Sequence, residues 1–290
     1  MGVVAGALEF TKYKNKERLT RERILMQVTK IDGKTITFPQ LRGSLAGLHY
    51  PCMAEIKYDG EFNYLSYSET DAYLINKYGT IKRDFPMLND IVKVLKDNKV
   101  ESATFVCELY WNTGKLGALY EFLAHKKDDA CKICLFDLIE LNGINTRIES
   151  YLDRKEQMQE VGVNKWLPTC WVVNDVPDTE HRFKEVTDDG WEGITVKSLE
   201  GSYISGPCSW VKMKFKDQSD YEVVLVDAHK ERIEIVALYP NGIRVTVGVK
   251  ASNRHKKHIS IGDMVTIEHQ GVLASGSLRH PVLIGRKEWK

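Results

Sequence analysis

The sequence predicts an α+β protein in which a mixed domain with antiparallel sheets precedes a small domain built only of strands. Strand-like and helix-like segments alternate up to residue 217, whereas short strand-like segments separated by turns follow it. The chain has 290 residues and is 43% hydrophobic, which is enough for one ordinary domain and a smaller second one.

A lysine stands at the end of the first predicted strand. Residues 53–57 and 62–67 read as strands, and Asp59-Gly60 lies between them. Asp-Gly between two such segments is a strong hairpin signal, so the strands should pair and Lys57 should lie where the first one ends. A lysine held in this way can be a nucleophile if its pKa is lowered, although Lys-x-Asp-Gly alone is most often a solvated hairpin tip.

Two apolar, β-branched and aromatic runs follow, at residues 104–110 and 132–138, and both read as strands. The first contains Glu108 and the second contains Phe136. Taken alone, Glu108 could be an exposed strand carboxylate and Phe136 could be an ordinary core residue.

Two later strands place lysines near their ends. Glu192 heads the first, after an Asp-Asp-Gly turn, and Lys197 falls near its end. Residues 209–216 alternate with a period of two, which places their lysines on one face and their apolar side chains on the other. The lysines are Lys212, Lys214 and Lys216, and the apolar residues are Val211, Met213 and Phe215. These lysines could also be the solvated face of an edge strand.

Helices are predicted at residues 86–96, 117–126 and 150–161. The last of these begins at a serine cap and should carry Arg154 and Lys155 on its polar face.

The second domain is predicted after a polar break at residues 216–221. Strands are expected at 222–228, 232–238, 243–249 and 264–269, separated by turn residues. About 70 residues of short strands suit a small barrel of the oligonucleotide-binding (OB) type.

Taken in order, these segments resemble the motifs of the ATP-dependent DNA ligases. Lys57-Tyr58-Asp59-Gly60 is similar to the first motif, Glu108 to the third, Phe136 to the aromatic position after it, Glu192-Gly193 with Lys197 to the fourth, and Lys212 with Lys214 to the fifth. Residues 276–281 and Arg286 are similar to the closing motif. Six motifs in one order are hard to obtain by chance.

The resemblance implies a small two-domain ligase. A nucleotidyltransferase (adenylation) domain would span residues 46–217 and an OB-fold domain 218–290, with the basic segment 1–45 packed on the former or part of it. The enzyme would be a monomer that uses ATP and Mg²⁺ (or Mn²⁺). It would seal 5′-phosphate/3′-hydroxyl nicks in double-stranded DNA through lysyl-AMP and DNA-adenylate, in repair, replication or recombination.

The resemblance also implies a role for each matching residue. Lys57 would carry AMP, while Lys212 and Lys214 would neutralise the α-phosphate and lower the pKa of Lys57. Glu192 would hold a divalent metal, and Glu108 would contact the ribose or the metal. The remaining expected roles are adenine stacking for Phe136, nucleotide binding for Lys197, recognition of the adenine amino edge for Glu55, and orientation of pyrophosphate for Arg279 and Arg286.

The first motif departs from the family at one position. The family usually has an arginine two residues after the glycine, where this chain has Phe62. We expect another cation, Lys77 or Arg42, to take the place of that arginine. Residues 76–79 and 286–290 also follow the family pattern only loosely.

Two other kinds of protein remain alternatives. An RNA ligase or a capping guanylyltransferase shares the lysine motif, but the ending at residues 276–281 favours DNA. A non-catalytic nick-binding module would explain Phe62, but such a module would not need the five residues Lys57, Glu108, Glu192, Lys212 and Lys214.

The net charge is only +1, so contact with DNA must come from segregated basic patches. Candidates are residues 12–23, 254–258 and 279–290. The six cysteines are scattered and no secretory leader precedes them, which predicts an intracellular, reducing compartment, namely the cytoplasm, with the nucleus as the alternative. Cys131 and Cys134 have the spacing of half a zinc site, but we expect both to be buried in a strand. No apolar stretch approaches the roughly 20 residues of a membrane span.

Overall fold

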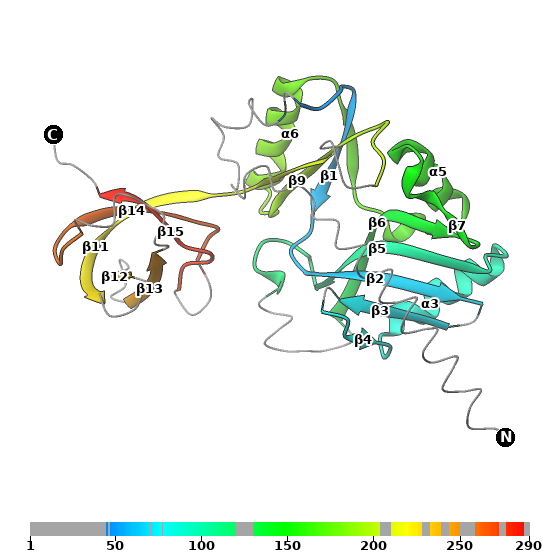
Figure 1. Cartoon of the computed structure of the whole chain (residues 1–290), viewed down its shortest axis with the longest axis horizontal. Helices are drawn as coiled ribbons and strands as arrows, with labels where there is room; N and C mark the ends of the chain where they lie inside the picture. The colour runs from blue at the N-terminus through cyan, green and yellow to red at the C-terminus, as the bar shows by residue number, and fades with distance from the viewer. Residues whose placement is uncertain are drawn as a thin grey trace. The chain divides into compact units, whose positions relative to one another are not determined.

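The computed structural model describes residues 45, 47–69, 71–76, 78–119, 130–203, 210–227, 233–238, 244–249, 259–272 and 277–286. The chain divides into two compact units, Met1–Met213 and Lys214–Lys290. The first contains two sheets and three helices among its described residues, and the second contains one sheet (Figure 1). The registered strand pairs of the described residues are antiparallel, which agrees with the predicted α+β class.

The larger sheet of the first unit is built around a long central pair of strands. Its order is β4 (Ile81–Lys82), β3 (Asp71–Asn76), β2 (Glu61–Ser68), β5 (Ser102–Trp111), β6 (Cys131–Leu141) and β7 (Ile144–Asn145). One face packs against α3 (Pro86–Asp97) and α5 (Tyr151–Glu160), in a core that includes Leu65, Phe105, Ile91 and Met158. Because side chains alternate along a strand, the opposite face carries Phe62, Tyr64 and Glu108.

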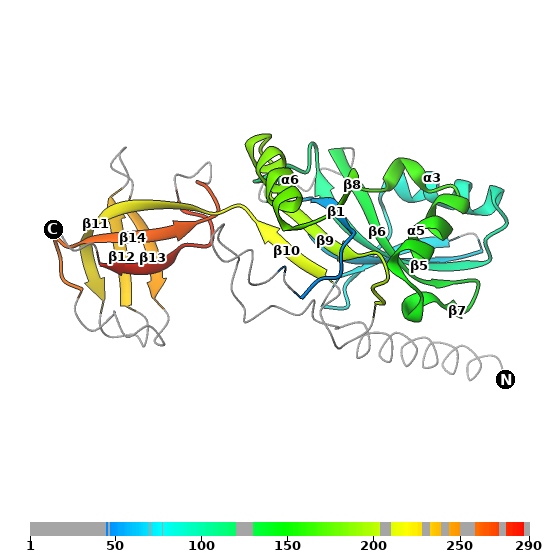
Figure 2. The ribbon, with the colours of Figure 1, turned by 90° about the horizontal axis from the view of Figure 1, so that it is seen from above.

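The smaller sheet of the first unit separates an apolar face from a polar one. Its order is β10 (Trp210–Lys214), β9 (Gly193–Ser198), β1 (Cys52–Lys57) and β8 (Cys170–Val173). The helix α6 (Val176–Asp188) lies against β9 and β1 (Figure 2). The core beneath it contains Ala54, Ile194, Val196, Val211 and Met213. The period of two predicted for residues 209–216 is confirmed for Val211 and Met213, and the lysines of β1, β9 and β10 occupy the other face.

The predicted hairpin at Asp59-Gly60 is wrong, because β1 and β2 belong to different sheets. The Asp59 N–H donates to the Gly114 carbonyl at 2.9 Å, and the Asp59 carboxylate accepts from the Gly117 N–H at 2.7 Å. A Cβ at Gly60 would lie 2.3 Å from the Leu109 carbonyl oxygen, so only glycine fits there. Asp59 and Gly60 therefore carry the chain from one sheet to the other.

The second unit contains one sheet, ordered β13 (Arg244–Val249), β12 (Ile233–Leu238), β11 (Asp217–Asp227), β14 (Met264–His269) and β15 (Val282–Arg286). Its described core includes Tyr221, Val223, Val265, Ile267 and Leu283. The four predicted strands are present. However, residues 217–221, predicted as a polar break, are the start of β11, because they pair with β14 along their whole length.

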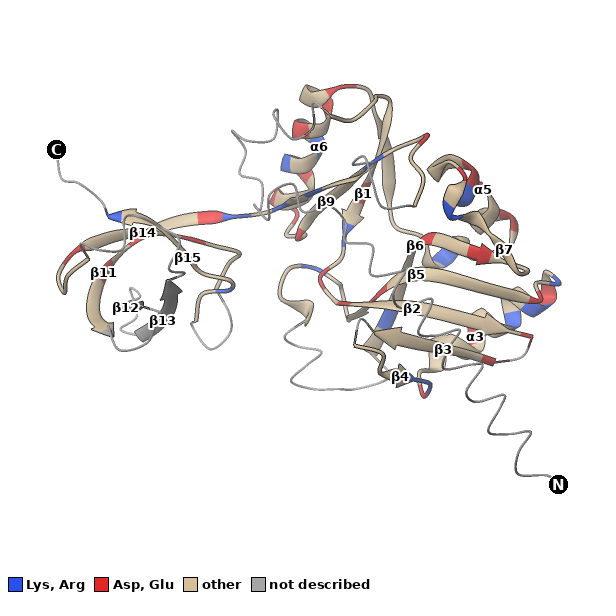
Figure 3. Ribbon diagram, in the orientation of Figure 1, with Lys and Arg blue, Asp and Glu red and all other residues tan. Residues whose placement is uncertain are grey.

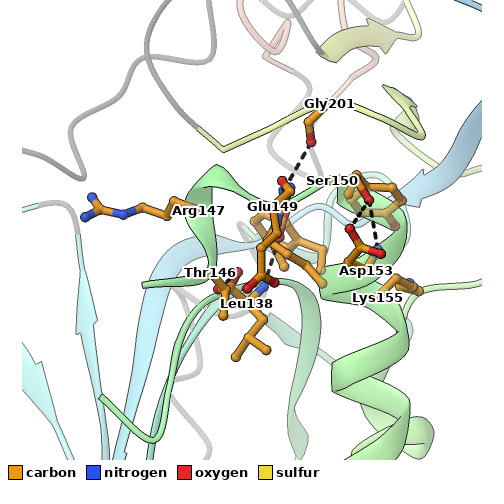
Figure 4. A network of polar contacts seen from close by, with 12 residues as sticks. Leu138, Thr146, Arg147, Glu149, Ser150, Asp153, Lys155 and Gly201 are labelled. Carbon is orange, nitrogen blue, oxygen red and sulfur yellow. Dashed lines mark hydrogen bonds and ion pairs between the residues drawn. The ribbon is translucent and has the colours of Figure 1, made fainter. Parts of the chain in front are cut away.

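The predicted helices at 86–96 and 150–161 are confirmed as α3 and α5, whereas most of the expected helix at 117–126 lies outside the described residues. The Ser150 side chain caps α5 by accepting from the Asp153 N–H, as Figure 4 shows. Arg154 and Lys155 are not on a solvated face, because Arg154 has no exposed surface and Lys155 has 5%. Both are paired with buried carboxylates instead.

Cys131 and Cys134 are buried in β6, as expected. No helix in the described part of the chain is long and apolar enough to cross a membrane.

The buried Arg154–Asp137 pair should dominate the stability of the first unit. We expect Arg154→Met to reduce the free energy of unfolding by about 3–5 kcal/mol, because it leaves the Asp137 charge buried without its partner. Urea unfolding followed by circular dichroism measures this change. Arg83→Met, which breaks an exposed pair with Asp71, is the matched control and should cost less than about 1 kcal/mol.

Replacing both partners, as Arg154→Met with Asp137→Leu, should recover part of the loss, since no unpaired charge remains. Equal unfolding midpoints for Arg154→Met and Arg83→Met would contradict the importance of the buried pair.

Candidate active site

A pocket opens between the two sheets of the first unit. Its lining comes from β1 and the residue after it, β5, β6, β9 and β10. The lining residues are Glu55, Ile56, Lys57, Tyr58, Glu108, Cys134, Phe136, Thr195, Lys197, Trp210 and Lys212. Six of the ten predicted site residues thus come together here, or seven with Glu192, which contacts Lys57.

Lys57 ends β1 and is held opposite Gly193 of β9. Its amine forms an ion pair with Glu192 and donates to the Tyr58 carbonyl at 3.4 Å. Burial lowers the pKa of the Lys57 amine, but the charges of Glu192 and Glu108 raise it more, so the pKa lies above its ordinary value. The expectation that neighbouring lysines lower this pKa is therefore wrong for the protein without nucleotide, because the carboxylates prevail.

Two carboxylates lie beside Lys57, the buried Glu192 and the partly buried Glu108. Burial raises the pKa of the Glu108 carboxyl to about 7, although the charges of Lys57 and Lys212 act to lower it. Glu192 also acts on Glu108, and its like charge contributes to the rise. No group of three or more His, Cys, Asp or Glu side chains that could hold a metal occurs within the described ranges.

The far end of the pocket is organised around Glu55. Its carboxylate accepts from Lys197 at 2.6 Å, from Lys155 at 3.1 Å and from the Tyr151 hydroxyl. Burial raises the pKa of the Glu55 carboxyl, but the charges of Lys197 and Lys155 lower it more. Glu55 is therefore held as a buried, ionised acceptor.

A second buried ion pair, between Arg154 and Asp137, adjoins the pair between Lys197 and Glu55. Arg154 donates from Nε and Nη2 to the two oxygens of Asp137, at 2.7 and 3.2 Å, and neither side chain is exposed. Arg154 also donates to the carbonyls of Glu149 and Gly201, whose positions around the start of α5 are shown in Figure 4. Because Lys197 lies 3.8 Å from Asp137, the two pairs form one network.

Aromatic rings surround the Lys197 amine. It donates to the Phe136 carbonyl at 2.6 Å and lies 4.5 Å from the ring centres of both Tyr151 and Trp210. Phe62 packs against Phe136 and Tyr64, with ring centres 6.2 and 4.9 Å apart. The position expected to hold an arginine therefore contributes to an aromatic cluster.

The cations expected to replace that arginine, Lys77 and Arg42, lie outside the described residues.

Three predicted site residues belong to the second unit. Lys214 is its first residue and the last of β10. Arg279 is 4% exposed and follows an isolated bridge between Val272 and Leu278. Arg286, at the end of β15, pairs with Asp263 at 3.0 Å.

The sequence analysis missed Tyr151, Arg154, Lys155 and Asp137 as members of the polar network. Tyr151, Arg154 and Lys155 are spaced i, i+3 and i+4, which places them on one face of a helix. That spacing is the available signal, although for Arg154 and Lys155 it is equally typical of a polar helix face.

Charged residues of both signs occur along the helices of the first unit (Figure 3). Figure 3 shows lysine and arginine interspersed with aspartate and glutamate over α5 and α6. The expected basic patches at 12–23 and 254–258 lie outside the described residues, and only 279–286 of the third is described.

Comparison with known proteins identifies the family of this chain. The family model "ATP dependent DNA ligase domain" matches residues 40–214. DNA ligase 2 of Thermofilum pendens is 30% identical over 197 residues, which are 61% of this chain and 32% of that protein. A probable DNA ligase of Aquifex aeolicus is 28% identical over 193 residues, with the same shares. The chain thus spans about a third of the length of these curated relatives.

Solved structures share the fold. The structure from an analysis of Lig E DNA ligases, described as DNA binding with a minimal scaffold, has a TM-score of 0.63 and 17% identity, covering 82% of this chain and 93% of that one. The structure "Pmar-Lig_Pre." has a TM-score of 0.65 and 19% identity, and the match covers 86% of this chain and 66% of that one.

Because the family match covers more than half of the chain and contains the whole pocket, the chain belongs to the ATP-dependent DNA ligase domain family.

Proposed function

We propose that this protein is an ATP-dependent DNA ligase, which seals 5′-phosphate/3′-hydroxyl nicks in duplex DNA by way of lysyl-AMP. The observation that carries the proposal is the placement of Lys57 at a strand end, against Glu192, in a pocket that Glu108, Lys197 and Lys212 also line. This set supplies a nucleophile, two carboxylates and two further cations within one pocket.

In the first step the neutral Lys57 amine attacks the α-phosphorus of ATP. A nitrogen–phosphorus bond forms, the bond to pyrophosphate breaks, and the amine proton leaves to water. Covalent catalysis of this kind divides one difficult displacement into easier ones. The 5′-phosphate of the nick then takes AMP from Lys57, and the 3′-hydroxyl displaces AMP to close the strand. Lys212 neutralises charge on the transferring phosphate, as phosphoryl transfers require.

Glu108 and Glu192 fit the magnesium that the family implies. Mg²⁺ is commonly held by one or two carboxylates together with phosphate oxygens and waters, so the buried Glu192 and the partly buried Glu108, both close enough to Lys57 to raise its pKa, are a suitable donor set. The bound ion would neutralise phosphate charge. Glu192 would also give up its ion pair with Lys57, which frees the amine for attack.

The base would lie at the other end of the pocket. We propose that the Phe136 ring stacks on adenine, that Lys197 helps hold the nucleotide, and that Glu55 accepts from the adenine amino group. The support is that all three line the pocket and that Lys197 bonds both the Phe136 carbonyl and Glu55.

The second unit would be an OB-fold domain that follows a nucleotidyltransferase domain, and its five antiparallel strands support this proposal. Arg286 and Arg279 would orient pyrophosphate in the first step. Arg286 is half-exposed, so it can exchange Asp263 for a phosphate, whereas Arg279 is buried and would need a local rearrangement. The substrate would be nicked double-stranded DNA, bound by a monomer.

Self-labelling tests the proposed nucleophile. Wild-type protein incubated with Mg²⁺ and α-labelled ATP should retain the label, and nicked DNA should discharge it as the nick is sealed. Lys57→Ala should retain none, because the attacking amine is missing. Lys184→Met, which alters an exposed lysine of α6, should label normally. Label from GTP instead would indicate a guanylyltransferase, and no label from either nucleotide would favour a binding module.

The raised pKa of Lys57 predicts the pH dependence of its reactivity. In the absence of nucleotide, acylation of Lys57 by a neutral reagent should increase with pH and have its midpoint above that of an ordinary lysine, because attack needs the free amine. Glu192→Gln should move this midpoint to lower pH, since it removes the largest charge that raises the pKa. Mass spectrometry of the Lys57 peptide measures the midpoint. An unchanged midpoint in Glu192→Gln would refute the assignment of Glu192 as the main charge that raises the pKa of Lys57.

Removal of metal should abolish self-labelling. EDTA should prevent it, and added Mg²⁺ or Mn²⁺ should restore it. Glu192→Gln should raise the Mg²⁺ concentration for half-maximal labelling by about tenfold or more, because one of two anionic donors is lost. Glu156→Gln, which alters an exposed glutamate of α5, is the control for Glu192→Gln. Identical metal titrations for Glu192→Gln and Glu156→Gln would exclude Glu192 as a ligand.

A further inference from the structure

Most of the hydrogen-bonding capacity of Glu55 is used within the protein. Among the described residues three donors reach its carboxylate: the Tyr151 hydroxyl and the Lys155 amine on Oε1, and the Lys197 amine on Oε2. A carboxylate offers about four lone-pair sites, two on each oxygen. Oε1 is therefore saturated, and one acceptor site remains, on Oε2.

The two donors that saturate Oε1 do not line the pocket. Tyr151 and Lys155 are one turn apart on α5, and both reach Oε1 of Glu55 from outside the pocket lining. Arg154, between them, fixes this turn of the helix through Asp137 and the carbonyls of Glu149 and Gly201. Since all three side chains are buried, their geometry is set by packing and not by the ligand.

The number of acceptor sites that a carboxylate leaves open decides whether it can recognise adenine or guanine. Adenine presents a single amino group at its C6 edge, next to the acceptor N1, so it needs one acceptor. Guanine presents two adjacent donors, N1–H and the 2-amino group, which pair best with both oxygens of one carboxylate. A carboxylate with one oxygen saturated can serve adenine but cannot make the paired contact to guanine.

We propose that Tyr151 and Lys155 are specificity-determining positioning residues, which saturate Oε1 of Glu55 so that the pocket accepts adenine and rejects guanine. The inference rests on the proposed function, because it takes a purine nucleotide as the ligand of this pocket. Neither residue touches the nucleotide, and both act through Glu55.

The test compares ATP with GTP in Lys155→Met and Tyr151→Phe. Calorimetry gives the dissociation constants of both nucleotides, and self-labelling gives both rates. We expect the preference for ATP over GTP to fall by about tenfold in Lys155→Met, and further in the double variant, because Oε1 becomes open to guanine. Lys184→Met, an exposed lysine of α6, is the matched control and should keep the wild-type preference.

A merely structural role predicts a different result. Weaker binding of ATP and GTP by the same factor, with the ratio unchanged, would overturn the proposal. If Lys155→Met does not fold, as judged by circular dichroism, Tyr151→Phe decides, since it removes only one hydroxyl. Absence of label on the wild-type protein would refute the proposed function, while the ratio of the two dissociation constants would still decide this inference.

Discussion

The first unit depends on charges that are buried in opposite pairs. Asp137 and Glu55, on strands of different sheets, are neutralised by Arg154, Lys155 and Lys197. A buried carboxylate without a partner costs several kcal/mol, so each member of this set is stable only while the others are in place. The network therefore connects β6, β1, β9 and α5, and it fixes the two sheets and the helix relative to one another.

The pocket follows from this connection and from strand alternation. Each sheet directs one set of apolar side chains toward its own helices, so the alternate side chains, which include both charged and aromatic residues, point to the space between the sheets. Glu55 and Lys57 are two residues apart on β1 and share that face, as Thr195 and Lys197 do on β9. One edge of the space thus gathers the charges around Lys57, and the other gathers the rings and the carboxylate around Lys197.

Local patterns were sufficient to predict most elements, because the alternation in β2 or β14 and the serine cap of α5 are properties of adjacent residues. Pairing between distant segments was not predictable in this way. Asp59-Gly60 has the composition of a hairpin turn, yet Asp59 is hydrogen-bonded to Gly114 and Gly117, and Gly60 packs closely against the Leu109 carbonyl, all of which are remote in sequence. In the same way, Arg154 and Lys155 indicate a solvated face until their carboxylate partners on β6 and β1 are known. The pocket residues were predicted by the order of the motifs, whereas the raised pKa of Lys57 depends on distances that no motif contains.

The crossing at Asp59 and Gly60 has a mechanical consequence for the pocket. Only Tyr58, Asp59 and Gly60 separate β1 from β2, and Asp59 is tied to the segment after β5 by two hydrogen bonds. The two sheets that line the pocket are therefore joined by a short connection directly beside the Lys57 amine. Because three residues can span only about 10 Å, the ends of β1 and β2 cannot move far apart, which limits how widely the two sheets can separate beside the Lys57 amine.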